Sequence, residues 1–263
     1  MGCGTKTRGR LTSNVLRPTS HVNVMSIDYV ILCGGQGKRL RFVVSQVPKV
    51  LAPVGGKPFL DILIAYLQTQ GAKRVILSTG YKADVIERHC RGRFQNLAIV
   101  FSHEKSPLGT GGAIKKACAM IRSKDFFVLN GDSFCRLDFK KLLAAHKKNN
   151  ALATLAVSKV KGTKDYGTMT LGDAGRVLAF EEKTKGARNA YVNVGVYCFR
   201  RDIDTFMPRK NKFSIERDFF PNLVGKDFYG FVTTQKFIDI GTPQRYRQAG
   251  RYFIKSKKLE VGR

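Results

Sequence analysis

The stretch Ile31–Leu40, ILCGGQGKRL, combines glycines with two cations directly after an apolar run. Glycine lets the backbone approach a ligand closely, and tight turns expose N–H groups that bind phosphate oxygens. Lys38 and Arg39 add positive charge at the same place. The spacing is neither the dinucleotide fingerprint G-x-G-x-x-G nor the Walker motif. We predict that the phosphates of a nucleoside triphosphate lie on this backbone; an ordinary glycine-rich turn is the alternative.

Another cation follows in the proline-punctuated stretch QVPKVLAPVGGKPF, where Lys49 comes directly after Pro48. A lysine held by a rigid loop can act as a fixed point charge on a phosphate group. An exposed loop lysine is the alternative, and this motif taken alone favours it.

The elements that would position these residues follow from periodicity, because short apolar runs alternate with helical segments from Met25 onward. We expect strands at 29–34, 73–80, 96–102, 125–133 and 151–160, and helices at 58–71, 82–90, 110–123 and 139–150. This succession predicts an α/β fold with a Rossmann-like, mixed but mostly parallel sheet covered by helices. Ligands bind at the carboxyl ends of strands in such sheets, where both GGQGKR and NGDSF lie.

After residue 159 the pattern changes to a small β-rich part. Residues 166–183 alternate and contain Gly-Asp turn residues, as in a hairpin. We expect a strand at 190–199, a short helix at 214–223 capped by Ser214, and strand, turn and helix at 235–253. The domain assignment is a disordered or non-native extension at 1–24, a single domain at 25–254 and a basic tail at 255–263.

The composition limits the partners. The 263 residues include 47 Lys and Arg against 19 Asp and Glu, a formal net charge of +28 that attracts polyanions. The cations are spread along the chain without zinc-finger or leucine-zipper spacing and without a stacking-aromatic motif, which disfavours nucleic acid. No apolar run approaches the roughly 20 residues of a membrane span. The six cysteines show no C-x-x-C spacing, which is typical of a reducing compartment.

Seven motifs, in this order, resemble those of the sugar-1-phosphate nucleotidyltransferase family: GGQGKRL, PKVLAPVGGKP, PLGTGGAI, NGDSF, FEEK, VNVGVY and FIDIGTP. The resemblance covers residues 26–253. It implies transfer of a nucleotidyl group from a nucleoside triphosphate to a sugar 1-phosphate, in the cytoplasm, by a catalytic core alone. The chain is most similar to the branch that transfers GMP to D-glycero-α-D-manno-heptose 1-phosphate, with the mannose 1-phosphate branch as a near neighbour.

The resemblance implies four catalytic residues. Arg39 matches the residue that holds the triphosphate, and Lys49 matches the lysine that bridges the sugar phosphate and the α-phosphate. Asp132 and Asp239 match the paired ligands of Mg²⁺ or another divalent cation. Each ends an apolar run, where an unpaired carboxylate is costly, and Mg²⁺ accepts a couple of carboxylates alongside water and phosphate. Turn caps are the alternative for both.

The nucleotide-binding residues that the family implies are Leu32, Gly34, Gly35, Gly37, Lys38, Arg39, Glu104, Gly109, Thr110 and Asp132. Glu104 aligns with the base-contacting position. A carboxylate only accepts hydrogen bonds and guanine offers two adjacent donors, so Glu104 favours GTP over other nucleotides. Pairing of Glu104 with Lys105 or solvent is the alternative. Lys38 stands where the family usually has threonine, so either an added phosphate contact or a solvent-facing lysine is open.

The sugar-phosphate-binding residues that the family implies are Lys49, Gly167, Glu182, Lys183 and Asn193. The residues do not decide which sugar is bound, and a homo-oligomer is compatible with them. A uridylyl-, thymidylyl- or cytidylyltransferase acting on a hexose 1-phosphate is an alternative. So is a non-catalytic regulatory subunit that binds a nucleotide sugar, although such proteins tend to lose the metal or phosphate residues that this chain retains.

Overall fold

The computed structural model describes residues 27–37, 39–40, 43–44, 46–159, 167–181 and 191–260, with side chains to residue 255, and Met1. The predicted site residues Lys38, Glu182 and Lys183 lie outside the described residues. So does the predicted N-terminal extension after Met1.

A nine-stranded mixed sheet forms the centre. Its strands are β1 (Asp28–Leu32), β4 (Arg74–Thr79), β5 (Ala98–His103), β6 (Asp125–Asn130), β8 (Ala153–Lys159), β9 (Thr168–Leu171), β10 (Val177–Glu181), β11 (Tyr191–Arg200) and β12 (Phe228–Thr233). The order is β10-β9-β11-β6-β1-β4-β5, with β8 paired to β11 and β12 to β8. Strands β5, β4, β1 and β6 run parallel, and β11 runs antiparallel to β6. The expected Rossmann-like α/β class is confirmed.

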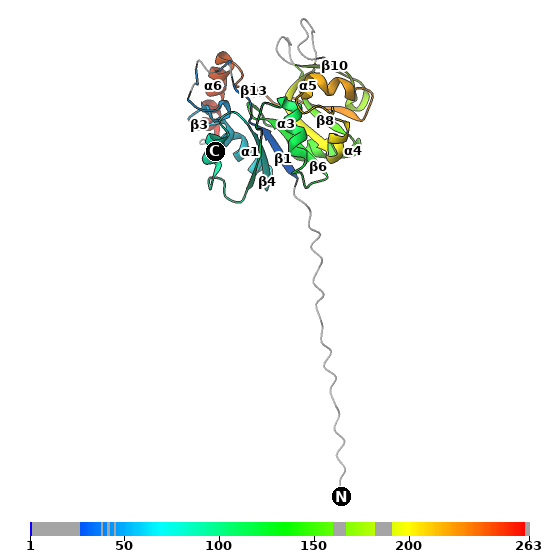
Figure 1. Cartoon of the computed structure of the whole chain (residues 1–263), viewed down its shortest axis with the longest axis horizontal. Helices are drawn as coiled ribbons and strands as arrows, with labels where there is room; N and C mark the ends of the chain where they lie inside the picture. The colour runs from blue at the N-terminus through cyan, green and yellow to red at the C-terminus, as the bar shows by residue number, and fades with distance from the viewer. Residues whose placement is uncertain are drawn as a thin grey trace.

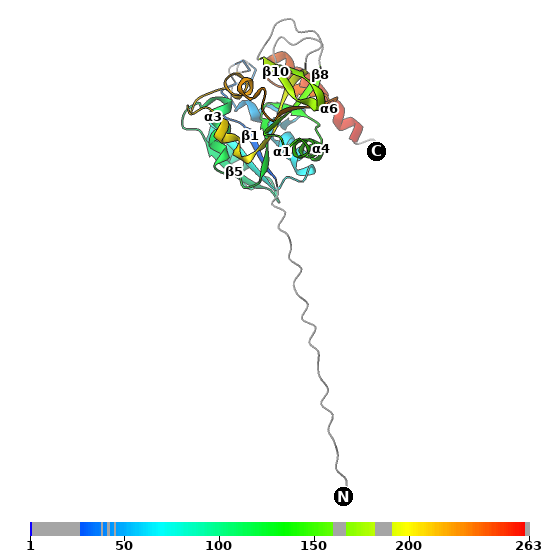
Figure 2. The ribbon, with the colours of Figure 1, turned by 90° about the vertical axis from the view of Figure 1, so that its right-hand side faces the viewer.

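Helices cover both faces of the parallel strands, because successive side chains of a strand point to opposite faces. The helices are α1 (Phe59–Thr69), α2 (Ala83–Cys90), α3 (Gly109–Cys118) and α4 (Phe139–Lys148). Tyr29 and Ile31 of β1 pack in one apolar cluster with α1, α2 and α4. Val30 packs in a second cluster with α3. Figures 1 and 2 accordingly place α1 and α3 on opposite sides of β1.

The β-rich part continues this sheet. Strands β9 and β10 form the expected hairpin, and β11 pairs with β6, β8 and β9. Helix α5 (Ile215–Asp218) is capped by the Ser214 side chain, as predicted, and is followed by the 3₁₀ turn η4 (Phe220–Leu223). Two further 3₁₀ turns are η2 (Asp173–Gly175) and η3 (Arg201–Phe206).

A small ribbon completes the fold beside α1. Strand β7 (Ser133–Cys135) pairs antiparallel with β13 (Phe237–Asp239), and a hairpin of β2 (Pro53–Val54) and β3 (Lys57–Pro58) follows the 3₁₀ turn η1 (Lys49–Leu51). Helix α6 (Pro243–Glu260) packs on β2 and β13. Its backbone continues through residues 255–260, inside the segment expected to be a basic tail.

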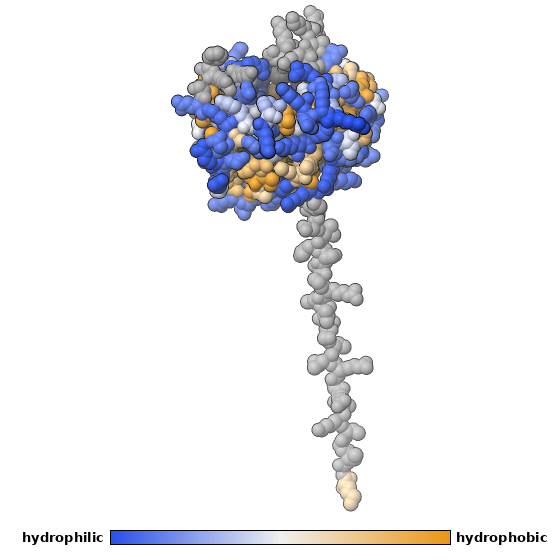
Figure 3. Space-filling view, in the orientation of Figure 1, coloured by the Kyte–Doolittle hydropathy of each residue, from blue (hydrophilic) through white to orange (hydrophobic). Residues whose placement is uncertain are grey.

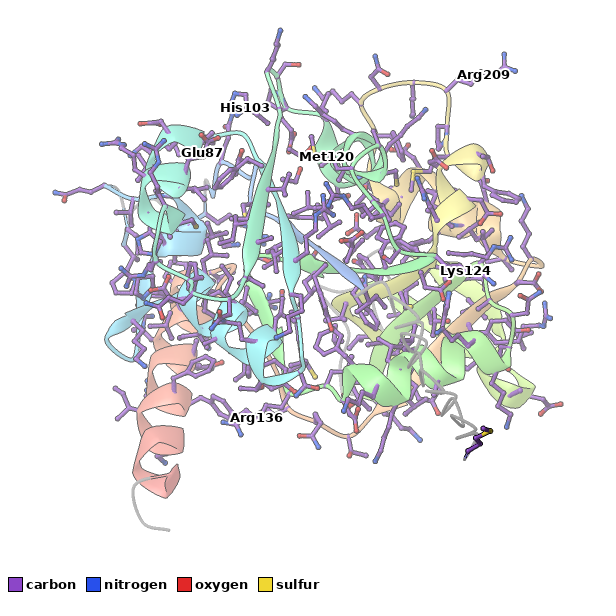
Figure 4. All side chains as sticks on the ribbon, turned by 90° about the horizontal axis from the view of Figure 1, so that it is seen from below. Glu87, His103, Met120, Lys124, Arg136 and Arg209 are labelled. Atoms are coloured by element: carbon purple, nitrogen blue, oxygen red, sulfur yellow. The ribbon has the colours of Figure 1, made fainter. Side chains whose placement is uncertain are left out.

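Many of the lysine and arginine side chains that make the chain basic face solvent. The face in Figure 3 is mostly hydrophilic, with a smaller apolar area. Lys124, Arg136 and Arg209, which are labelled in Figure 4, are exposed. Within the described part of the chain, no helix has the length and apolar character needed to cross a membrane.

Candidate active site

The glycine loop after β1 is shaped by two neighbouring side chains. A Cβ added to Gly34 would lie 2.4 Å from Oε1 of Glu104, so only glycine leaves room for that carboxylate. Gly37 has a φ of +59°, and a Cβ there would lie 3.0 Å from Cβ of Lys49. Gly35 has no atom within 4 Å of its Cβ position and faces open space. Two of these glycines are therefore explained by the protein's own packing, while Gly35 borders free volume.

A cavity of about 440 Å³ opens at the carboxyl ends of β1 and β6. The predicted nucleotide residues that line it are Leu32, Gly34, Gly35, Gly37, Arg39, Glu104, Gly109, Thr110 and Asp132. The predicted residue Lys49 also lines the cavity. So do Asn130 and Gly241, two residues that were not predicted as site residues. Five motifs that are distant in the sequence thus meet around one cavity, as expected for the rim of a mostly parallel sheet.

Lys49 and Asp132 form an ion pair inside this cavity. Nζ of Lys49 donates a hydrogen bond to Oδ2 of Asp132, and Ser133 Oγ donates to Oδ1 at 3.2 Å. Burial opposes ionisation of Asp132, but the Lys49 ammonium outweighs it and lowers the pKa of the carboxyl below its usual value. The lysine is not an exposed loop residue, since only 14% of its side chain is accessible.

Asp239 is brought beside Asp132 by the β7–β13 ribbon. Asp239 is opposite Ser133 in the register, and Ile240 N donates to the Asp132 carbonyl at 3.0 Å. Oδ1 of Asp239 accepts from Gly241 N at 2.8 Å, and Oδ2 lies 3.4 Å from Arg245 Nη1.

Gly241 marks the point where the charged groups meet. A Cβ at Gly241 would lie 2.9 Å from Oδ1 of Asp239 and 3.8 Å from both Arg39 Nη2 and Lys49 Nζ. Arg39 and Lys49 therefore converge on the same place as the two aspartates. Among the described residues, no group of three or more His, Cys, Asp or Glu side chains is arranged to hold a metal ion. A cation at this place would need further ligands from its substrates or from water.

Glu104 forms a buried wall of the cavity and is only 9% exposed. Its Oε2 accepts from Leu108 N at 3.0 Å, and its Oε1 accepts from Ser78 Oγ at 3.4 Å. The alternative of a solvated carboxylate is wrong, because this side chain is held in place by the protein.

The PLGTGG motif has a packing role that its composition did not reveal. Gly109 has a φ of +73°, and a Cβ there would lie 2.5 Å from the Phe213 carbonyl oxygen. A Cβ at Gly111 would lie 2.1 Å from the Phe213 ring, and one at Gly112 would lie 2.1 Å from Asn211 O. These glycines allow α3 to pack directly against the segment before α5.

Of the expected sugar-phosphate residues other than Lys49, the structure describes Gly167 and Asn193, which lie next to each other: Asn193 N donates to the Gly167 carbonyl at 3.1 Å. Neither residue lines the 440 Å³ cavity. The bulged part of β11 lies between Asn193 and the cavity. A Cβ at Gly195, within this bulge, would lie 2.7 Å from Nδ2 of Asn130, and Asn130 lines the cavity.

A mostly parallel sheet with a glycine loop and converging cations at its rim is typical of nucleotide-binding α/β proteins. The model of the nucleotidyl transferase family matches residues 28–256, and the chain belongs to this family. It is 42% identical over 224 residues to the D-glycero-α-D-manno-heptose 1-phosphate guanylyltransferase of Aneurinibacillus thermoaerophilus, with 85% of this chain and 96% of the relative covered.

A second relative and a solved structure agree. The enzyme of the same name from Campylobacter jejuni is 37% identical over 217 residues, covering 82% of this chain and 96% of its own length. The crystal structure of HddC from Yersinia pseudotuberculosis superposes with a TM-score of 0.76 at 38% identity, covering 86% of this chain and 99% of that chain. The same protein has also been solved in complex with GMP-PN.

Proposed function

We propose that this protein transfers GMP from GTP to D-glycero-α-D-manno-heptose 1-phosphate and releases pyrophosphate. The observation that supports it best is one cavity lined both by a held carboxylate, Glu104, and by the group of Arg39, Lys49 and Asp132. Such a cavity offers an acceptor for the base at one place and positive charge for phosphates at another. The names of the two relatives and their nearly complete coverage support the choice of substrates.

Glu104 is proposed to accept hydrogen bonds from guanine. The pairing edge of guanine presents N1–H and N2–H₂ side by side, and an ionised carboxylate is an acceptor at both oxygens. Uracil and thymine present one donor between two carbonyls, which a carboxylate meets poorly. Because Glu104 is buried and held by Leu108 N, its position is set before the nucleotide arrives.

The phosphate chemistry needs positioning and charge more than a reactive protein group. An oxygen of the sugar 1-phosphate attacks the α-phosphorus of GTP, and the bond from that phosphorus to the bridging oxygen of the β-phosphate breaks. Arg39 is proposed to hold the triphosphate, and Lys49 to neutralise the phosphates that react. Both are cations already converging at Gly241.

Asp132 and Asp239 are the residues proposed to hold Mg²⁺ or another divalent cation. Asp239 ends β13 and Asp132 directly precedes its partner strand β7, and two such carboxylates are a hard oxygen donor set of the kind that Mg²⁺ uses with phosphates and water. Bound there, the cation would neutralise charge on the phosphates. Lys49 must then exchange its contact with Asp132 for one with a phosphate, which is a move of one side chain within the same cavity.

The sugar phosphate is proposed to bind at Gly167 and Asn193, on the side of the cavity formed by the β11 bulge. Glu182, Lys183 and Lys38 keep their proposed roles by motif alone. We also propose that the protein works in the cytoplasm, which fits its buried, unpaired thiols at Cys33, Cys90, Cys118, Cys135 and Cys198.

The test is release of pyrophosphate across four nucleoside triphosphates and a set of hexose and heptose 1-phosphates, with and without Mg²⁺. We expect turnover that is highest with GTP and the manno-heptose, that needs the cation, and that is lost in Asp132→Asn and Asp239→Asn. A preference for mannose 1-phosphate would move the assignment to that neighbouring activity. Tight binding of a nucleotide sugar with no turnover for any pair would favour the regulatory subunit instead.

A further inference from the structure

Glu216 in helix α5 was not singled out by any motif, yet its carboxylate joins the two halves of the proposed site. Oε2 of Glu216 accepts from Thr110 Oγ1 at 2.7 Å and from Ser214 Oγ at 2.8 Å. Oε1 accepts from the Tyr197 hydroxyl at 3.4 Å. One carboxylate thus contacts α3, the cap of its own helix and β11.

On the nucleotide side, Glu216 sets the position of Thr110, which lines the cavity. Oγ1 of Thr110 accepts from Ile215 N at 2.9 Å, so its proton is directed to Glu216. The backbone reinforces this contact, since Gly111 N donates to Phe213 O and Phe213 N donates to Leu108 O, each at 3.0 Å. Helix α5 and the first turn of α3 are therefore joined by side-chain and backbone hydrogen bonds.

On the sugar side, Glu216 acts through Tyr197. The Tyr197 hydroxyl accepts from Asn193 Nδ2 at 2.9 Å, and Oδ1 of Asn193 accepts from Gly195 N at 2.8 Å. Burial and then the neighbouring Glu216 charge raise the pKa of Tyr197 well above its usual value, so the phenol keeps its proton. The Tyr197 hydroxyl donates its hydrogen bond to Glu216, while its oxygen accepts from the side-chain amides of Asn193 and Asn130.

The backbone of β11 departs from regular pairing at the same place. Its register with β8 shifts between Asn193 and Tyr197, and Gly195 within this bulge has a φ of +77°. Bulges re-aim side chains, here those of the residues proposed to face the sugar. The orientation of Asn193 therefore depends on a hydrogen-bond chain whose charged end is Glu216.

We propose that Glu216 is a positioning residue that couples nucleotide binding to sugar-phosphate binding. The inference rests on the proposed function and adds to it a link between the two substrates. Binding of nucleotide against Thr110 orders Glu216, Glu216 orders Tyr197, and Tyr197 fixes Asn193 for the sugar. By linkage, the sugar phosphate then strengthens nucleotide binding by the same factor.

The substitution Glu216→Gln breaks this chain without changing its shape. The amide oxygen can still accept from Thr110 and Ser214. The amide NH₂ then faces Tyr197, whose lone pairs are already used by asparagine donors. Tyr197→Phe breaks the chain on the sugar side only. Arg217→Gln is the matched control. The Arg217 side chain is exposed on the same short helix, and its replacement by glutamine also changes the net charge by one.

The experiment measures the dissociation constant of a GTP analogue that cannot react, with and without sugar 1-phosphate, and the KM of both substrates. In the wild type we expect the sugar phosphate to tighten analogue binding roughly five-fold or more. In Glu216→Gln the two dissociation constants should become equal, and the KM for sugar phosphate should rise roughly ten-fold. Tyr197→Phe should share the sugar effect and the loss of coupling, with an unchanged dissociation constant for the analogue measured alone. Arg217→Gln should match the wild type.

Three results would overturn the inference: no coupling in the wild type, wild-type coupling in folded Glu216→Gln, or a lower Tm and fewer active molecules with unchanged KM values. The last would assign Glu216 to folding stability alone. A wild-type protein that turns over no nucleotide and sugar phosphate pair would refute the proposed function and this inference together. An active wild type with an unaffected Glu216→Gln variant would refute the inference only.

Discussion

The choice of base can be tested by replacing Glu104 with glutamine, because the structure dictates which way the new amide turns. Leu108 N donates to Oε2 at 3.0 Å, so the amide oxygen must take that place. The NH₂ group then replaces Oε1, the atom that lies over Gly34 and 3.4 Å from Ser78 Oγ. A guanine donor would meet a second donor there instead of an acceptor.

The size of the effect follows from the loss of a hydrogen bond to a charged acceptor, about 1.5–3 kcal/mol. That corresponds to a roughly 10- to 150-fold fall in kcat/KM for GTP relative to UTP. The assay is pyrophosphate release with each nucleotide and the same sugar 1-phosphate. Ser78→Ala is the control, since it removes only a long hydrogen bond and should leave the ratio within about three-fold. An unchanged GTP/UTP ratio in Glu104→Gln would refute the assignment of Glu104 to the base.

Three further changes test other parts of the molecule. Lys49→Met removes the cation paired with Asp132, so turnover should fall at least roughly a hundred-fold. Mn²⁺, titrated without nucleotide, should bind this variant more tightly than the wild type. An unaltered Mn²⁺ affinity would contradict the proposal that Lys49 exchanges Asp132 for a phosphate. Burial lowers the pKa of His146 to about 4, although the neighbouring Asp125 charge acts to raise it. Between about pH 4 and pH 6.5 the folded state therefore binds fewer protons than the unfolded state. The contribution of neutral His146 to the free energy of unfolding should therefore be complete above about pH 6.5, and on acidification that free energy should fall by up to about 1.4 kcal/mol per pH unit. Urea unfolding at several pH values should show a smaller slope in His146→Gln. Gly250→Ala in α6 meets no atom within 4 Å and should stabilise the fold by about 0.5–1 kcal/mol in the same assay, and a loss of stability would contradict that geometry.

Local patterns predicted most elements of this fold because the elements are defined by their own side chains. Every residue of β4 is buried, and its apolar centre, Val75–Leu77, has no alternation, as expected for a strand covered on both faces. Helix α1 begins after Pro58 and ends before Gly71, as its composition predicted. The expected strand at 125–133 was too long, because β6 ends at Asn130 and β7 begins at Ser133. The sequence did not separate the three-residue strand β7 from β6 and did not predict β12; both are defined by pairing with distant strands, β7 with β13 and β12 with β8.

The sequence by itself determined which chemical groups were available and the order in which they occur, from the glycine loop to the last aspartate. Only the tertiary structure decided which of them meet: Lys49 contacts Asp132 across 83 residues, and Thr110 contacts Glu216 across 106. Such contacts depend on sheet register and on the crossing of distant segments, which leave no periodic signal in the chain. Motif order could therefore identify the nucleotidyl transferase family, whereas the contacts of Glu216 appeared only when α3, α5 and β11 were seen packed together.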